Sequence, residues 1–213
     1  MNYKIPIETS ARHIHLSRED FDTLFGPGKD LTPKKYLSQP GQYLAEERVT
    51  ITGPRGTFKN VGIIGPLRSA TQLEVSATDC RKLGIPAVIR QSGDIEGTPG
   101  MTVSTELATV VKEKGAIVAK RHIHMTPIEA MRMHVKDNEE VFVIIESNNR
   151  SLIFANVVVR VSKNFRLAMH LDTDEANAFA GDDDTFGVIL KLFEGNTYNL
   201  KMWAEELLWG INR

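Results

Sequence analysis

The chain contains the tetrapeptide Arg-His-Ile-His twice, at residues 12–15 and 121–124. Each copy runs directly into a sequence that is typical of a helix start, the first at Ser17 and the second at Thr126. The two segments therefore predict the same strand-to-helix unit used twice. Such an internal repeat limits the possible folds, because it indicates a duplicated or pseudo-symmetric architecture.

The histidines of each copy are spaced to bind a metal. Alternate side chains of a strand point to the same face, so a His-x-His pair can direct two imidazoles toward one point. Neutral imidazole is a natural ligand for zinc. One isolated pair occurs by chance, but two copies in the same context predict metal binding, by His13 and His15 and by His122 and His124.

A catalytic zinc usually has three protein ligands and one open position, so each pair needs a third partner. His170, at the end of a strand-like segment, is the candidate for one site. Glu74 fits the other, because it lies between Leu73 and Val75 in a strand-like segment. From local sequence alone, a carboxylate in that position more commonly faces solvent. His134 stands alone in a helical segment, which is typical of a surface histidine.

Most other apolar segments are short, rich in β-branched residues and bounded by Gly, Pro or Asn, which predicts strands. The predicted strands are residues 48–52, 57–64, 72–76, 87–90, 115–119, 140–146, 152–161 and 165–170. Helices are fewer, and we expect them at 18–25, 77–83, 127–133, 174–180 and, near the C-terminus, 200–209. Many short strands with brief helices favour barrels over a doubly wound sheet.

The composition limits the class of protein. The 213 residues are 41% hydrophobic and 25% charged, which is typical of a globular protein with one or two domains. The net charge of −1 offers no basic surface for nucleic acid, and no segment reaches the length of a membrane span. The single cysteine, Cys80, excludes an internal disulfide and fits a reducing compartment, so we expect a cytoplasmic protein.

Several motifs, in the same order along the chain, resemble the PduL-type phosphotransacylases, which are the phosphate propanoyltransferases of propanediol utilisation and their cytoplasmic relatives. The similarity runs from about Ser10 to Gly187. It is carried by Ala11 to Ser17, Gly65-Pro66-Leu67-Arg68, Gln72-Leu73-Glu74, Gly93-Asp94, Gly97 to Gly100, Lys120 to Met125 and Met169 to Asn177.

This resemblance implies a mainly β, pseudo-duplicated fold of two small antiparallel β-barrels capped by short α-helices. One barrel would combine the N-terminal strand with the C-terminal half, over residues 1–20 and 115–190. The other would come from the central residues 28–114. The tail, residues 191–213, lies beyond the family core and is expected to be partly helical. A homodimer is also expected.

The resemblance also assigns the site and the reaction, which converts acyl-CoA (propanoyl-CoA or acetyl-CoA) and phosphate into acyl phosphate and CoA. Two zinc ions would bind per chain, one to His13, His15 and Glu74 and the other to His122, His124 and His170. Arg68 matches the arginine that holds phosphate, and Asn177 matches a polar residue beside the second zinc. Arg12 and Arg121 are further candidates for binding phosphate.

The residues are consistent with that chemistry. Attack of phosphate on a thioester brings two anions together and releases a thiolate, so it benefits from metal ions and arginines. We find no convincing Ser-His-Asp or Cys-His arrangement, which agrees with direct attack by phosphate. Family members that enter microcompartments carry an N-terminal extension, whereas His13 lies close to Met1, so a free cytoplasmic enzyme is expected.

Two other readings stay open at this point. A cupin-like metalloenzyme is one, because Glu19 and Gly26 follow His13 and His15 at a cupin-like spacing, although Glu19 falls within a helix start. The other is a non-catalytic barrel module stabilised by zinc. Four protein ligands around each metal would favour this module, whereas an exchangeable water would exclude it.

Overall fold

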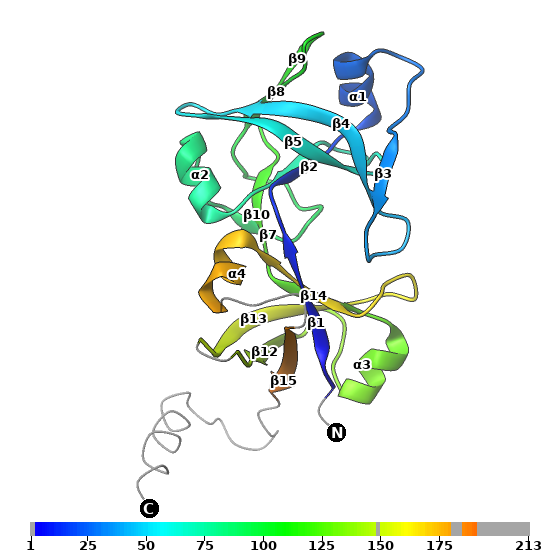
Figure 1. The fold of residues 1–213 in the computed structure, drawn as a ribbon, viewed down its shortest axis with the longest axis vertical. Coiled ribbons are helices and arrows are strands. Elements are labelled where there is room, and N and C mark those ends of the chain that lie inside the picture. Colours follow the sequence, from blue (N-terminus) through cyan, green and yellow to red (C-terminus); the bar gives the residue numbers. More distant parts are fainter. Residues whose placement is uncertain (1–2, 148–149, 180–184, 191–213) are drawn as a thin grey trace, which may run out of the picture.

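The computed structural model describes residues 3–147, 150–179 and 185–190. Its strands form two sheets that follow one another along the longest axis of the molecule (Figure 1). We call them the closed barrel and the large sheet. Each half carries short helices, so the predicted class, a mainly β fold in two halves capped by helices, is confirmed.

The closed barrel lies at the lower end of Figure 1. Its strands, in spatial order, are β1 (Ile5–Ser10), β14 (Ala168–Asp172), β11 (His122–Met125), β13 (Leu152–Val161), β12 (Glu140–Ile145) and β15 (Phe186–Leu190). Helices α3 and α4 belong to this half of the chain, at Pro127–Met133 and Thr173–Phe179.

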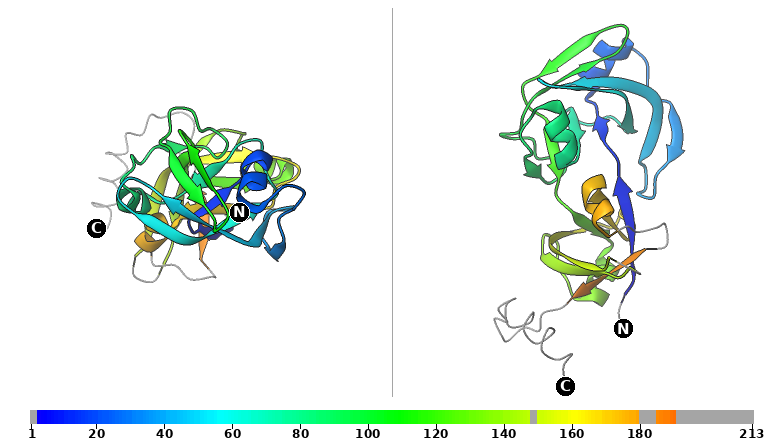
Figure 2. Two further views of the ribbon diagram at one scale, coloured as in Figure 1. Left: turned by 90° about the horizontal axis from the view of Figure 1, so that it is seen from above. Right: turned by 60° about the vertical axis from the view of Figure 1, so that its left-hand side comes forward.

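The large sheet has nine strands and lies at the upper end of Figure 1. The order is β7 (Ile89–Arg90), β10 (Ala116–Ala119), β6 (Gln72–Glu74), β2 (His13–His15), β5 (Thr57–Gly65), β4 (Tyr43–Thr52), β8 (Met101–Ser104) and β9 (Thr109–Lys112). Strand β3 (Pro33–Tyr36) pairs with β4 beside this path. Figure 2 shows the long strands β4 and β5 (cyan) curving across this half. Its helices are α1 (Arg18–Phe25) and α2 (Ala77–Leu83).

The two halves exchange a strand with each other. Strand β1 directly precedes β2 in the chain, yet it pairs with β14 and β15 in the closed barrel. Strand β10 directly precedes β11, yet it pairs with β6 and β7 in the large sheet. The chain therefore crosses between the sheets immediately before each His-x-His strand. Both histidine pairs are thereby placed at the junction of the two halves.

The observed strand pairing differs from the expected grouping of residues 1–20 with 115–190 in one barrel. Of the first segment only β1 belongs to the closed barrel, because β2 pairs with β5 and β6 in the large sheet. Strand β10 lies in the large sheet as well, because its neighbours are β6 and β7. Whether the two halves are separate domains stays a prediction.

The duplication predicted from the repeated tetrapeptide extends to strand pairing. Strand β2 lies between β5, to which it is parallel, and β6, to which it is antiparallel. Strand β11 likewise lies between the parallel β13 and the antiparallel β14. The sheets are therefore mixed rather than purely antiparallel, since a His-x-His strand that joins its sheet by a crossover acquires one parallel neighbour.

Helices α1 and α3 begin where the capping residues Ser17 and Thr126 predicted. Ser17, Ser76 and Thr126 cap α1, α2 and α3, each accepting a hydrogen bond from the backbone N–H three residues on. The predicted bounds of these helices agree with the observed ones, and α4 begins one residue earlier than expected. The predicted helix at 200–209 lies outside the described residues. Within the described ranges no helix is both long and apolar enough to cross a membrane.

Several strands lie outside the predicted ranges, among them β3, β8, β9 and β15, and β4 begins earlier than expected. Every residue of β3 is exposed, and the strand contains Pro33 and two lysines. Its sequence therefore lacks the alternation of apolar and polar residues that marks a half-buried strand. Pairing with β4 decides its conformation instead.

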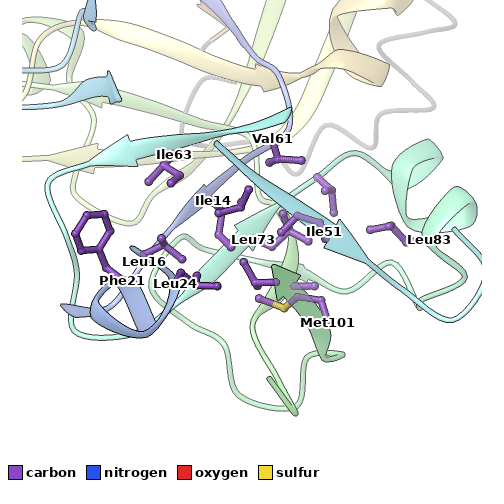
Figure 3. Packing of buried hydrophobic residues seen from close by; sticks show 14 of the residues in the cluster. Ile14, Leu16, Phe21, Leu24, Ile51, Val61, Ile63, Leu73, Leu83 and Met101 are labelled. Atoms are coloured by element: carbon purple, nitrogen blue, oxygen red, sulfur yellow. The ribbon is translucent and has the colours of Figure 1, made fainter. Parts of the chain in front are cut away.

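Each half has its own hydrophobic core. The core of the large sheet includes Ile14, Leu16, Phe21, Leu24 and Leu73, all nearly inaccessible to solvent (Figure 3). The core of the closed barrel includes Ile5, Ile123 and Met125. Ile14 and Ile123 are the residues between the two histidines of each copy. Because they are buried in the cores, the histidines on either side must point to the opposite face, toward the junction.

Substitution of Ile5 by Ala tests whether β1 stabilises the closed barrel. Ile5 is 0% exposed, so we expect its truncation to lower the free energy of unfolding by about 2–5 kcal/mol. Ile153→Ala is the matched control, because Ile153 is 39% exposed in the same barrel, and its loss should cost less than about 1 kcal/mol. Chemical denaturation measures both. Equal losses for the two variants would contradict the role of β1 in the barrel core.

Candidate active site

The first group of potential ligands consists of His13 and His15 on β2 and Glu74 on β6. Antiparallel pairing of these strands places His13 directly opposite Glu74. The Nε2 atoms of His13 and His15 lie 3.5 and 3.8 Å from the two carboxylate oxygens of Glu74. All three side chains are buried, and their ligand atoms lie within 4.8 Å of one another. We call this group the first triad.

The second triad consists of His122 and His124 on β11 and His170 on β14. Its construction repeats the first, because antiparallel pairing places His122 directly opposite His170. The ligand atoms again lie within 4.8 Å of one another. The structure thus brings together each set of three residues that the resemblance assigned to a zinc ion.

Backbone contacts orient the imidazoles. The Nδ1 atoms of His13 and His122 lie 2.8 Å from the carbonyl oxygens of Ala11 and Lys120, each two residues earlier in the chain. His15 Nδ1 lies 3.0 Å from the carbonyl oxygen of Ile64. A carbonyl can only accept, so each Nδ1 donates its proton and each Nε2 keeps its lone pair for a metal.

The environment keeps most of these imidazoles neutral. Burial lowers the pKa of His15 to about 3 and that of His124 to about 2, with further lowering by the neighbouring histidines. Burial likewise lowers the pKa of His122 and of His170 to about 4. Burial opposes ionisation of Glu74, but the neighbouring His13 and His15 side chains and a hydrogen bond from Ser92 lower its pKa overall. Metal ligands must be deprotonated, so all five groups are in the form that binds zinc.

His124 provides a direct test of whether a metal fits. Its side chain is buried, and neither ring nitrogen has a hydrogen-bond partner within the described residues. An unpaired buried polar group is costly, and a metal ion bound to one nitrogen would remove much of that cost. Three histidines, or two histidines and a carboxylate, are typical zinc ligand sets that leave a fourth position open. The triads therefore fit zinc.

Both triads line one cleft of about 920 Å³ between the two sheets. Its cationic lining residues include Arg68, Arg160 and Lys35. Arg68 Nη1 donates to Ser92 Oγ at 2.9 Å, and the same hydroxyl donates to Glu74 Oε1 at 2.7 Å. Burial lowers the pKa of Arg68, but arginine titrates so far above neutrality that it stays cationic. The cleft thus combines two potential metal sites with fixed positive charge.

The family model for phosphate propanoyltransferase matches residues 6–182. The chain belongs to the phosphate propanoyltransferase family. Phosphate propanoyltransferase from Thermotoga maritima is 55% identical over 174 residues, which cover 82% of this chain and 83% of that protein. The enzyme of the same name from Salmonella typhimurium is 51% identical over 179 residues, which cover 84% of this chain and 85% of the relative. The resemblance inferred from the motifs is therefore confirmed.

The remaining predicted site residues of this phosphate propanoyltransferase family member are Arg12, Arg121 and Asn177. Arg12 and Arg121 already form ion pairs, with Asp79 and Glu175 respectively. Asn177 lies on the exposed side of α4, whereas Ala176 and Phe179 are the residues of that helix that line the cleft. Direct contact of these three predicted residues with substrate stays a prediction.

Sequence reasoning missed several polar residues in the cleft of this family member, among them Arg160 and Gln39. Arg160 on β13 pairs in register with His124. It interrupts an apolar run of valines, and a charged residue in a run that predicts a buried strand was the available signal. Gln39 donates to the carbonyl oxygen of Arg166 at 2.9 Å, and its amide lies 3.4 Å from His170 Nε2. No local pattern marks Gln39, because only the fold brings its loop to β14.

The lowered histidine pKa values predict how the metal-free protein responds to acid. Buried histidines bind protons less readily than unfolded ones, so the free energy of unfolding should fall as pH drops from about 6.5 toward 4. Each proton of difference is worth about 1.4 kcal/mol per pH unit. Replacing His124 with Leu removes one such group and should make the dependence shallower. Denaturation of both metal-free proteins from pH 7.5 to 4.5 measures the slopes, and identical slopes would contradict this account.

Proposed function

We propose that the chain is a zinc-dependent phosphate acyltransferase. It interconverts acyl-CoA and phosphate with acyl phosphate and CoA, with propanoyl-CoA or acetyl-CoA as the acyl donor. The observation that carries this proposal is the shared cleft, in which both triads lie beside the half-buried cation of Arg68. Membership of the phosphate propanoyltransferase family supports the same reaction class.

In the proposed reaction a phosphate oxygen attacks the carbonyl carbon of the thioester. The new C–O bond forms, the C–S bond breaks, and CoA leaves as a thiolate. His13, His15 and Glu74 would hold one zinc ion, and His122, His124 and His170 the other. A zinc ion bound there would supply Lewis acidity for the thioester oxygen and a soft partner for the leaving sulfur.

The protein's own residues position the phosphate. Arg68 is held by Ser92, so its guanidinium is ordered before substrate binds. Its planar donors suit two phosphate oxygens, and partial burial strengthens the attraction because less water competes. Arg160 and Lys35 add positive charge to the same cleft. Together they offset the repulsion between phosphate and the anionic CoA substrate.

The alternatives receive less support from the geometry. In a cupin-like arrangement Glu19 would join His13 and His15, but Glu19 lies exposed in the first turn of α1. A purely structural zinc site would have four protein ligands, whereas each triad offers three and opens to a cleft. The expected homodimer and the cytoplasmic location stay predictions.

A thiol-release assay tests the proposal. Propanoyl-CoA or acetyl-CoA is supplied to zinc-loaded and to chelated protein, with and without phosphate, and free CoA and acyl phosphate are measured. We expect CoA release that depends on both phosphate and zinc, with an equal amount of acyl phosphate. Release of CoA at the same rate without phosphate would indicate a thioesterase and overturn the transferase assignment.

Substitution of Arg68 by Ala tests the phosphate site. We expect phosphate-dependent turnover to fall by about 10²–10³-fold, since a preorganised donor to the developing charge is lost. The zinc content should not change, because Arg68 belongs to neither triad. Arg18→Ala is the matched control, since Arg18 pairs with Asp22 and Asp30 at the surface. Loss of zinc, or turnover equal to the control, would contradict the proposed role.

A further inference from the structure

The arginine that precedes the first histidine pair is held firmly by a helix. Arg12 donates from Nε and Nη2 to the two carboxylate oxygens of Asp79, at 3.0 and 2.8 Å. The Asp79 side chain is only 3% exposed. The guanidinium carbon also lies 4.3 Å from the centre of the Phe58 ring, within the range of a cation–π contact. Arg12 is thus held in place by a bidentate ion pair with Asp79 and a cation–π contact with Phe58.

The second half of the molecule repeats this arrangement. Arg121 Nε lies 3.3 Å from Glu175 Oε1, and its guanidinium carbon lies 5.2 Å from the centre of the Phe154 ring. Asp79 and Glu175 each stand in the first turn of a helix, α2 and α4. The two phenylalanines lie on β5 and β13, the parallel neighbours of the His-x-His strands. Equivalent partners therefore hold both arginines.

The topology shows what each ion pair connects. Arg12 directly precedes β2, which carries His13 and His15, and α2 begins shortly after Glu74 on β6. The ion pair with Asp79 therefore joins the start of one ligand strand to the helix that follows the other. In the closed barrel, Arg121 joins the start of β11 to α4, which directly follows His170 on β14. Each arginine ties together the two strands that carry its triad.

A further hydrogen bond links the two arrangements. The backbone N–H of Thr78 in α2 donates to Asp174 Oδ2 in α4 at 2.8 Å. Thr78 is adjacent to Asp79, and Asp174 is adjacent to Glu175. A continuous series of contacts thus runs from Arg12 through both helices to Arg121.

We infer that Arg12 and Arg121 are positioning residues, each of which holds the three ligands of its own triad in the geometry that binds zinc. This inference rests on the metal sites of the proposed function. Ligands from two separate strands bind a metal tightly only if the strands are held in place before the metal arrives. Outer contacts of this kind typically account for about 10–100-fold in metal affinity. The arginines act through the strands and helices, rather than by touching the metal or the phosphate.

The test measures zinc affinity one triad at a time. The His124→Ala background retains the first triad, and the His15→Ala background retains the second. Arg12→Ala should weaken zinc binding by about 10-fold or more in the first background and leave it unchanged in the second. Arg121→Ala should act on the second triad alone, with a smaller effect because its ion pair has a single, longer contact. Competition with a chromogenic chelator measures each affinity.

Three further variants keep the result interpretable. Asp79→Asn removes the charge on the other side of the ion pair with little change of shape, and it replaces Arg12→Ala if that variant fails to fold. Combining Arg12→Ala with Asp79→Asn should weaken zinc binding little more than either change alone, because both break the same contact. Arg18→Ala removes a surface ion pair and should leave zinc affinity unchanged.

Different results would contradict the proposed metal sites and the positioning role of the arginines. If the otherwise unchanged protein binds no zinc, the proposed metal sites are wrong. If it binds zinc but Arg12→Ala has no effect, or weakens both triads equally, the positioning role is overturned. An Arg12→Ala variant with unchanged zinc affinity and a raised KM for phosphate would instead show that Arg12 contacts the substrate.

Discussion

Both triads depend on the direct opposition of two ligands across an antiparallel strand pair. His13 faces Glu74 across β2 and β6, and His122 faces His170 across β11 and β14. Opposed Cβ atoms lie about 4.5–5.5 Å apart, so a third ligand on the neighbouring strand reaches the His-x-His pair without help from a loop. A slip of one residue would turn Glu74 or His170 to the opposite face. Burial of Ile14 and Ile123 in the two cores opposes such a slip.

The exchange of strands between the halves turns two ligand groups into one site. Because β1 and β10 each pair in the sheet of the other half, the chain crosses the junction immediately before each His-x-His strand. The triads then line the same cleft, together with Arg68 and Arg160. The same burial lowers the histidine pKa values and leaves neutral imidazoles available to a metal. The strand exchange that forms the cleft therefore also buries the histidines, and this burial keeps them neutral and able to bind a metal.

Local signals predicted some features and could not predict others. The capping residues Ser17 and Thr126 located two helices, because the capping hydrogen bond spans only a few residues. Glu74 was ambiguous from its neighbours alone, since a carboxylate in a strand more commonly faces solvent. Only pairing with β2 makes it a buried partner of two histidines. Arg160 and Gln39 were missed because their contacts with the second triad join distant parts of the chain.

The sequence by itself determined the repeated strand-to-helix unit, the histidine pairs and the family, because these are properties of short segments in a given order. The tertiary structure decided which strands pair, and hence which side chains meet. It also decided that Arg12 and Arg121 face carboxylates on α2 and α4. Charge and shape alone allow an arginine to bind either phosphate or carboxylate. Its partner is set by which group the fold brings within reach.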